Sequence, residues 1–131
     1  MEACLLGEGS GANAPAEKAS FLCITWGASG AAILRRSDMT LCITPAFLLP
    51  NPDQSSPHAH TQVVDTIGAG DTFAAGMLYG LYFSQQSWTL QRTLEFANEL
   101  AGRRVCQQGS EGLGDSMVDR VGGKGAGPAQ A

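Results

Sequence analysis

The stretch from 63 to 80 reads VVDTIGAGDTFAAGMLYG and carries the strongest structural signal in the chain. Apolar residues lead into a Gly-Ala-Gly turn, and a run of helix-forming residues follows it. We therefore expect a short strand over 61–65 that turns into a helix over 72–83. Gly76 and Gly80 each weaken that helix by ~1 kcal/mol relative to alanine, and they permit close packing on a neighbour.

The turn itself has the composition of an anion-binding site. Gly68 and Gly70 lack a Cβ atom, so the backbone can turn tightly and approach a ligand. The first amides of a helix are unpaired donors at the positive end of the helix dipole. Asp71 would repel a bound phosphate, but it suits a general base that takes a proton from a hydroxyl attacking phosphorus. Aspartate also stabilises an ordinary helix start by ~0.3–1 kcal/mol, so the spacing alone leaves both interpretations open.

Two other glycine-rich motifs are excluded. A Rossmann fingerprint requires a third glycine or alanine at the position where Phe73 stands. A Walker A loop requires Gly-Lys followed by serine or threonine, and the sequence lacks that triplet.

Upstream of this stretch, short apolar runs alternate with turn residues. Phe21–Gly27 (FLCITWG), Ala31–Leu34 (AAIL) and Leu41–Leu49 (LCITPAFLL) each predict a strand. Downstream, Ser87 or Thr89 is expected to cap a second helix. Apolar residues recur along that helix at helical spacing, namely Leu90, Leu94, Ala97, Ala101 and Val105.

Composition changes at both ends of the 131 residues. Small polar residues dominate the N-terminal part, and we expect a flexible segment over 1–20. Glycine dominates the C-terminal part, and we expect a disordered tail over 119–131. One folded region is then expected over 21–118.

Charge and cysteine usage limit the partners and the compartment. The net charge is −4 and the basic residues do not cluster, which argues against nucleic-acid binding. The sequence contains no apolar run of ~18 residues that could span a membrane. The four cysteines form no CxxC pair, so a reduced, cytoplasmic setting is expected; they are Cys4, Cys23, Cys42 and Cys106.

The segment 65–73 (DTIGAGDTF) closely resembles the C-terminal signature of PfkB-type, or ribokinase-like, carbohydrate kinases. ITWGASGAAIL is similar to the strand-turn-strand that contributes to the nucleotide site of these kinases, and LEFANELAGRRVCQQGSEG is similar to the helix and loop that follow. The sequence of these segments is most similar to the ketohexokinase (fructokinase) branch, and the resemblance covers about 21–114. The resemblance implies an α/β fold, the C-terminal portion of a ribokinase-like three-layer α/β/α architecture with an incomplete sheet.

The resemblance also implies roles for individual residues. Asp71 matches the base that deprotonates the sugar hydroxyl. The anion hole for the transferred phosphoryl group is matched by the amides of Gly68, Ala69 and Gly70. Positions near the nucleotide are matched by Thr25, Gly27, Gly30 and Asn98. Several members hold a monovalent cation such as K⁺, largely through backbone carbonyls, at positions matched by Asp65, Ile67, Arg104, Gln107 and Gly109. Trp26 is expected in the core, with stacking on the base as the alternative.

The implied activity is ATP-dependent phosphorylation of a sugar hydroxyl, on fructose or another small monosaccharide, with Mg²⁺ bridging the ATP phosphates. The sugar-binding residues of the family lie upstream of the part that this chain resembles. We therefore expect a truncated chain that carries the ATP site, the anion hole and the base but lacks the sugar-binding half. The alternative is a non-catalytic nucleotide- or anion-binding remnant that acts as an interaction module. The identity of the sugar and the oligomeric state stay open.

Overall fold

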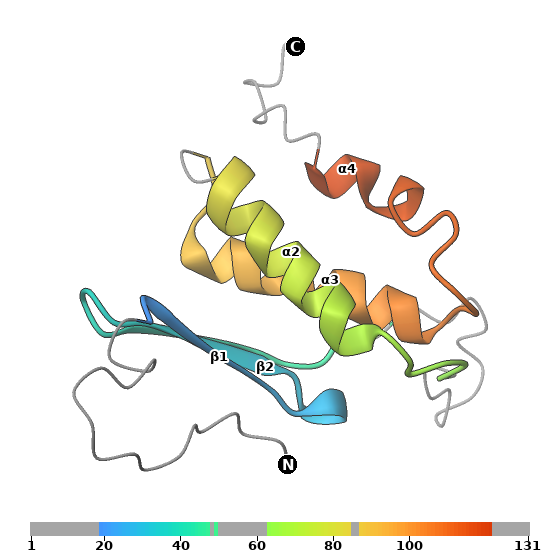
Figure 1. Ribbon diagram of the computed structural model, residues 1–131, viewed down its shortest axis with the longest axis horizontal. Coiled ribbons are helices and arrows are strands. Elements are labelled where there is room, and N and C mark those ends of the chain that lie inside the picture. Colours follow the sequence, from blue (N-terminus) through green and yellow to red (C-terminus); the bar gives the residue numbers. More distant parts are fainter. Residues whose placement is uncertain (1–18, 48, 50–62, 85–86, 122–131) are drawn as a thin grey trace, which may run out of the picture.

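The computed structural model describes residues 19–47, 49, 63–84 and 87–121. Its sheet is an antiparallel meander of β1 (Phe21–Thr25), β2 (Ala31–Arg35) and β3 (Thr40–Thr44), in that order (Figure 1). The three expected strands are thereby confirmed. The third ends at Thr44, well before Leu49, because the next residue, Pro45, has no N–H to continue the ladder.

Two helices lie side by side on one face of this sheet (Figure 1). They are α2 (Ala69–Phe83) and α3 (Leu90–Val105). The expected second helix is confirmed, and Thr89 caps it by accepting a 3.1 Å hydrogen bond from the amide of Arg92. Helix α2 begins at Ala69, earlier than the expected start at Thr72. Residues 69–71, the second half of the turn expected over 66–71, therefore belong to the helix.

The strand expected over 61–65 is wrong for residues 63–65, which belong to no strand. The amides of Val64 and Asp65 both donate to the carbonyl of Val105, at 2.7 and 3.1 Å. The segment therefore pairs with the end of α3 and not with a sheet edge. Residues 61–62 lie outside the described residues.

After α3 the chain returns along that helix through a 3₁₀ turn, η2 (Asp115–Met117), and a short helix, α4 (Val118–Val121). Arg120 of α4 pairs with Glu99 of α3 at 3.3 Å, and its carbonyl accepts a bond from Arg92. The boundary expected between the folded region and the tail, after residue 118, falls inside α4. Residues 1–18 and 122–131, which include most of the two expected end segments, lie outside the described residues.

The core fills the space between the helices and the facing side of the sheet. It consists of buried side chains from β2 and from both helices, namely Ala31, Ile33, Phe73, Met77, Leu94 and Ala97. The two helices approach closely at Gly76 and Gly80, as expected from the sequence. A Cβ atom on Gly76 would lie 2.7 Å from the Cα of Ala97, so the backbones nearly touch there.

Gly80→Ala is expected to destabilise the protein. A Cβ atom at this position would lie 2.4 Å from Cγ2 of Thr93, which is itself buried. Overpacking of this kind costs about 1–3 kcal/mol, which outweighs the gain of up to about 1 kcal/mol in helix propensity. Thermal unfolding measures the effect. Gly70→Ala, in the same helix with no atom within 4 Å of the added Cβ, is the matched control and should not lower the melting temperature. Equal melting temperatures for Gly80→Ala and the wild type would contradict the close packing.

The side of the sheet that faces away from α2 and α3 is apolar on all three strands. The register aligns Leu22 with Leu34 and Leu41, and it aligns Ile24 with Ala32 and Ile43. Strands with apolar side chains on both faces are typical of sheets that helices cover on both sides. The fold is therefore one side of the expected three-layer α/β/α architecture, with an incomplete sheet.

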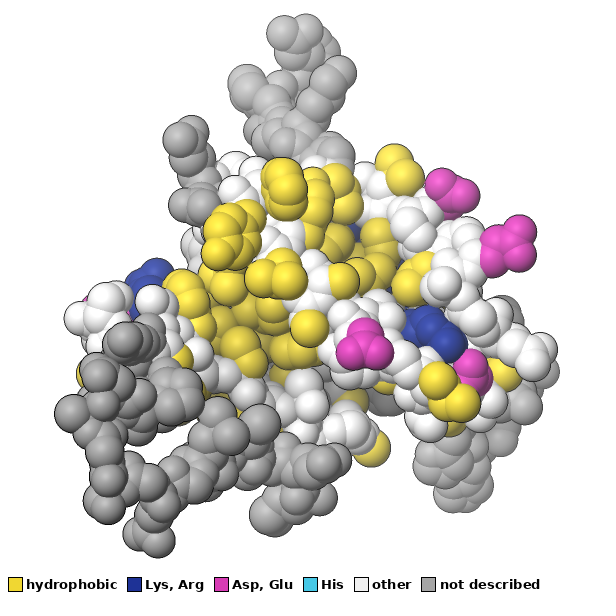
Figure 2. All heavy atoms as spheres, viewed as in Figure 1, with side chains coloured by type: hydrophobic (Ala, Val, Ile, Leu, Met, Phe, Trp, Pro, Cys, Tyr) yellow, Lys and Arg dark blue, Asp and Glu magenta, His cyan; other side chains and the backbone are white. Residues whose placement is uncertain are grey.

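Helix α2 is likewise apolar beyond the side that it buries. Leu78, Tyr82 and Phe83 are exposed, and Figure 2 shows hydrophobic side chains gathered over this helix. A helix that is apolar around most of its circumference is typical of an element enclosed by other parts of a larger fold. Within the described residues, no helix is long and apolar enough to cross a membrane.

Candidate active site

A cavity of about 400 Å³ opens between the turn after β1, the end of β3, and the two main helices. This volume is in the range of small-molecule sites. All four residues expected near a nucleotide line it, together with two of the three expected anion-hole residues. The lining is Thr25, Gly27, Ala28, Gly30, Ala46, Phe47, Val63, Thr66, Ala69, Gly70, Phe73, Asn98, Ala101, Gly102 and Val105.

Much of this lining was not anticipated from the sequence. Asn98, Ala101, Gly102 and Val105 follow one another at helical spacing, so they form one face of α3. Because the resemblance placed Asn98 near the nucleotide, this spacing was the signal in the sequence that could have found the other three residues. Phe47, in contrast, lies beyond the end of β3, and no local pattern marked it.

The turn after β1 is a 3₁₀ turn, η1 (Gly27–Ser29), closed by a 2.9 Å bond from the amide of Trp26 to the carbonyl of Gly30. Gly30 has φ of 104°, and a Cβ atom there would collide with the carbonyl of Thr44. Gly27 also has positive φ, but no atom lies within 4 Å of its Cβ position, so its backbone is open to a ligand. Trp26 is 44% exposed and does not line the cavity. The expectation that it lies in the core is wrong, because its side chain projects from a turn at the edge of the sheet.

The start of α2 has the geometry of an anion site. Gly68 stands before the helix with φ of 77°, and its carbonyl accepts bonds from the amide and the hydroxyl of Thr72, at 2.9 and 2.7 Å. These two bonds fix the orientation of the first turn. The amide of Ala69 donates to the carbonyl of Thr66 at 3.3 Å. Gly70 and Asp71 follow within the first turn, where the α-helix offers their amides no acceptor four residues back.

Asp71 is exposed and follows Gly70, which lines the cavity, but Asp71 is not itself among the lining residues. Among the described residues, no side chain pairs with its carboxylate. An exposed carboxylate in the first turn of α2 is a candidate general base.

Two hydrogen bonds from side chains of α3 hold the end of β3 and the residue that follows it. The side-chain amide nitrogen of Asn98 donates to the carbonyl of Pro45 at 2.7 Å, and Gln91 reaches the carbonyl of Ile43 at 3.2 Å. Phe47 packs against Gly102, where a Cβ atom would lie 2.8 Å from the ring. Because one N–H of the Asn98 side-chain amide is engaged by the carbonyl of Pro45, its oxygen and its second N–H are left for a ligand.

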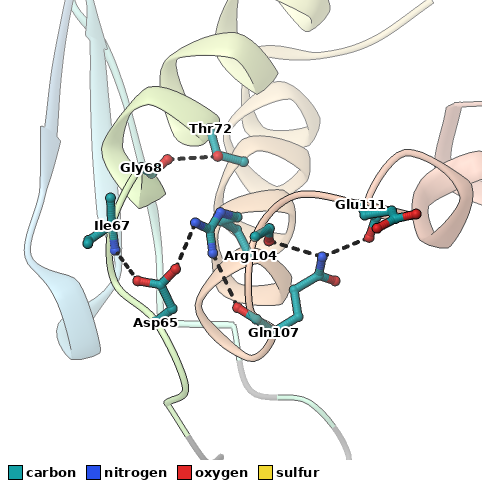
Figure 3. A network of polar contacts seen from close by, with 8 residues as sticks. Asp65, Ile67, Gly68, Thr72, Arg104, Gln107 and Glu111 are labelled. Carbon is teal, nitrogen blue, oxygen red and sulfur yellow. Dashed lines mark hydrogen bonds and ion pairs between the residues drawn. The ribbon is translucent and has the colours of Figure 1, made fainter.

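The residues expected around a monovalent cation come together in one polar network (Figure 3). Arg104 donates to Oδ2 of Asp65 at 3.0 Å and to the carbonyl of Gln107 at 3.2 Å. The side chain of Gln107 donates to the carbonyls of Gly109 and Glu111, at 3.2 and 3.0 Å. The backbone amide of Ile67 and then the guanidinium of Arg104 lower the pKa of the Asp65 carboxyl. The side chain of Arg104 is thus part of this network, whereas the resemblance assigned these positions to a cation largely through backbone carbonyls.

Asp65→Asn is expected to reduce the acid sensitivity of the fold. A carboxyl whose pKa is lowered by folding contributes stability above its unfolded pKa of about 3.9, and this contribution is lost as the pH falls toward the folded pKa. The wild type should therefore lose more of its melting temperature between about pH 6 and pH 3 than the variant. Asp119→Asn is the control, because Asp119 is exposed on α4, away from this network. If the melting temperatures of the wild type and of Asp65→Asn fell by the same amount over this pH range, the Asp65 network would not be formed.

Comparisons with known proteins identify the family and the fold. The family described as pfkB family carbohydrate kinase matches residues 11–117. Ketohexokinase from Mus musculus is 38% identical over 52 residues, which make up 40% of this chain and 16% of the ketohexokinase. The crystal structure of the Methanocaldococcus jannaschii nucleoside kinase, an archaeal member of the ribokinase family, aligns with a TM-score of 0.56 at 21% identity. The alignment covers 80% of this chain and 31% of that one, so the chain spans less than a third of the solved kinase, and at this identity the likeness shows the fold alone.

Proposed function

Because the chain belongs to the pfkB family of carbohydrate kinases, we propose that it supplies the ATP site, the anion hole and the general base for phosphorylation of a sugar hydroxyl. The proposed acceptor is fructose or another small monosaccharide, which is supported by the similarity to a ketohexokinase. The proposed location is the cytoplasm, where Cys23, Cys42 and Cys106, all free thiols, would stay reduced.

One observation carries the proposal: the cavity reaches from the glycine turn after β1 to the first turn of α2. A nucleotide bound along this path would place its base against α3 and Phe47, near the oxygen of Asn98. Its phosphates would lie at Gly70, where the helix start offers unpaired amides and a positive dipole. Amides fixed in this way stabilise the charge that develops on the phosphoryl group during transfer.

Asp71 would accept the proton of the attacking hydroxyl. Its carboxylate stands one residue beyond Gly70, is exposed, and has no partner among the described residues, so an attacking hydroxyl can reach it. Proton removal by a positioned base contributes typically 10²–10⁴-fold to a reaction of this class.

Mg²⁺ is expected to arrive with ATP, held mainly by phosphate oxygens and water, because such an ion needs few protein ligands. Bound in this way, it neutralises charge on the phosphates. The described residues contain no group of three or more His, Cys, Asp or Glu side chains arranged to hold a metal ion. The contribution of this chain is therefore proposed to be the amides at the start of α2.

Calorimetric titration with Mg·ATP, followed by an assay for sugar phosphate with fructose as acceptor, tests the proposal. We expect saturable binding with one ATP per chain. Binding accompanied by fructose phosphate would establish the kinase reaction. Binding without any sugar phosphate is expected both of a kinase portion that lacks its sugar-binding half and of the alternative, a nucleotide-binding interaction module, so it would establish the nucleotide site alone. No ATP binding would contradict the proposal.

A further inference from the structure

The side chain of Arg104 lies at the centre of the polar network between α2 and α3 (Figure 3). It extends from the last turn of α3, is 8% exposed, and contacts Asp65 and the carbonyl of Gln107. A guanidinium stays protonated throughout the pH range in which proteins are folded. The network therefore contains a fixed positive charge that belongs to the chain itself.

Two of the carbonyls that the family resemblance assigns to a monovalent cation, those of Gln107 and Gly109, are acceptors in this network, and so is the carboxylate of Asp65. Oδ1 of Asp65 accepts the amide of Ile67 and Oδ2 accepts Arg104, so both carboxylate oxygens are engaged. The carbonyl of Gln107 also accepts Arg104. The carbonyls of Gly109 and Glu111 accept the side chain of Gln107. A K⁺ ion would have to share these oxygens with N–H donors, and the adjacent guanidinium would repel it. The residues do not fit an added cation.

The same guanidinium reaches the first residue of the candidate anion hole. A Cβ atom on Gly68 would lie 3.9 Å from one terminal nitrogen of Arg104 and 4.0 Å from Nε. The positive charge thus lies beside Gly68, the residue that precedes α2. Its bond to Asp65, whose other oxygen holds the amide of Ile67, connects α3 to the segment that enters the turn.

We propose that the Arg104 guanidinium takes the place of the monovalent cation and that the site needs no added K⁺. Arg104 is a positioning residue: it holds Asp65 and the loop 107–111 against the start of α2, and it adds positive charge behind the anion hole. The inference rests on the proposed function only in that the anion hole receives phosphate. The replacement of the ion by a side chain is a property of the fold and can be tested without nucleotide.

Thermal unfolding of the wild type in potassium chloride and in choline chloride, at equal ionic strength, is the first test. An ion that binds only the folded state stabilises it by mass action, and K⁺ at ten times its Kd would raise the folding equilibrium constant about tenfold. We expect the same melting temperature in the two salts. A rise that is specific to K⁺ would overturn the proposal.

Three variants extend this test. Arg104→Ala removes the charge and frees Oδ2 of Asp65 and the carbonyl of Gln107, so it should melt lower than the wild type in choline and recover part of the loss in K⁺. Arg104→Lys keeps a positive charge and should stay insensitive to K⁺. Arg103→Met is the matched control, because Arg103 adjoins Arg104 in sequence but pairs with Glu99 on α3.

An Arg104→Ala variant that melts like the wild type in both salts would contradict the role of the side chain. If that variant does not fold, the wild type and Arg104→Lys still decide the question.

Mg·ADP titrations in the same two salts separate this inference from the proposed function. We expect the Kd of the wild type to agree between the salts within about twofold, less than the change expected for an essential bound ion. Affinity that requires K⁺ would overturn the inference while leaving nucleotide binding established. No binding in either salt would contradict the proposed function, and an unchanged melting temperature would still support Arg104 as the built-in cation.

Discussion

Replacing Gly70 by alanine is expected to remove most of the affinity for ATP while leaving the fold as stable as before, or more so. Gly70 lies in the first turn of α2 and lines the cavity, and no atom lies within 4 Å of the Cβ position. The new methyl group would occupy the space through which a phosphate approaches the amides. Loss of hydrogen bonds to a charged group costs about 1.5–3 kcal/mol each, which corresponds to roughly a 10–100-fold weaker Kd.

Adenosine provides the control for this prediction, because it lacks the phosphates. The affinity of Gly70→Ala for adenosine should equal that of the wild type, and its melting temperature should not fall, since alanine favours a helix by up to about 1 kcal/mol over glycine. Calorimetric titrations with Mg·ATP and with adenosine measure the difference. Equal losses for both ligands would show that the substitution disturbs the base pocket, and an unchanged ATP affinity would show that phosphate binds elsewhere.

Asp71→Asn is expected to lower the rate of sugar phosphorylation by about 10²–10⁴-fold, because the amide cannot accept the proton of the attacking hydroxyl. ATP affinity should stay the same or rise slightly, since the variant removes a negative charge beside the phosphate site. The initial rate of sugar phosphate formation at saturating ATP, together with the Kd for Mg·ATP, tests both statements.

Asp119→Asn is the matched control for the change in charge. Asp119 is exposed on α4, which packs near α3 and away from the cavity lining. Its replacement should leave both the rate and the affinity unchanged. A rate for Asp71→Asn equal to that of the wild type would remove Asp71 from the role of base, while the assignment of the ATP site would stand.

The local parts of the fold could be predicted from the sequence. Leu90, Leu94 and Ala97 recur at the helical period, and α3 occupies the expected residues with the expected threonine cap. The three strands of the meander also follow from short apolar runs separated by turns. These features depend on neighbours in sequence, which is why pattern and propensity were sufficient.

The errors arose where distant residues decide the structure. Val64 and Asp65 have the composition of a strand, but their amides bond to the end of α3, some 40 residues along the chain. Trp26 is apolar in a strand-like run, yet the turn that follows β1 turns it outward. Helix α2 begins at Ala69 for a local reason that no apolar pattern marks: the amide and the hydroxyl of Thr72 both donate to the carbonyl of Gly68.

The candidate site divides in the same way. The glycine turns and the start of α2 are local signatures, whereas Asn98 was expected only from the family resemblance, and the structure brings them to one cavity. Phe47 was not anticipated, because only the clamp of the β3 exit across α3 places it there. The side chain of Arg104 was not anticipated either, since its burial depends on Asp65, which lies 39 residues earlier in the sequence.

The central claim is that a nucleotide binds along this cavity with its phosphates at the start of α2. Titration of the ¹⁵N-labelled protein with Mg·ADP, followed through the backbone amide resonances, tests that claim most directly. The largest shifts are predicted at Gly68, Ala69 and Gly70, with a second group from Gly27 to Gly30. Saturating binding that leaves both groups of amides unshifted would contradict the claim.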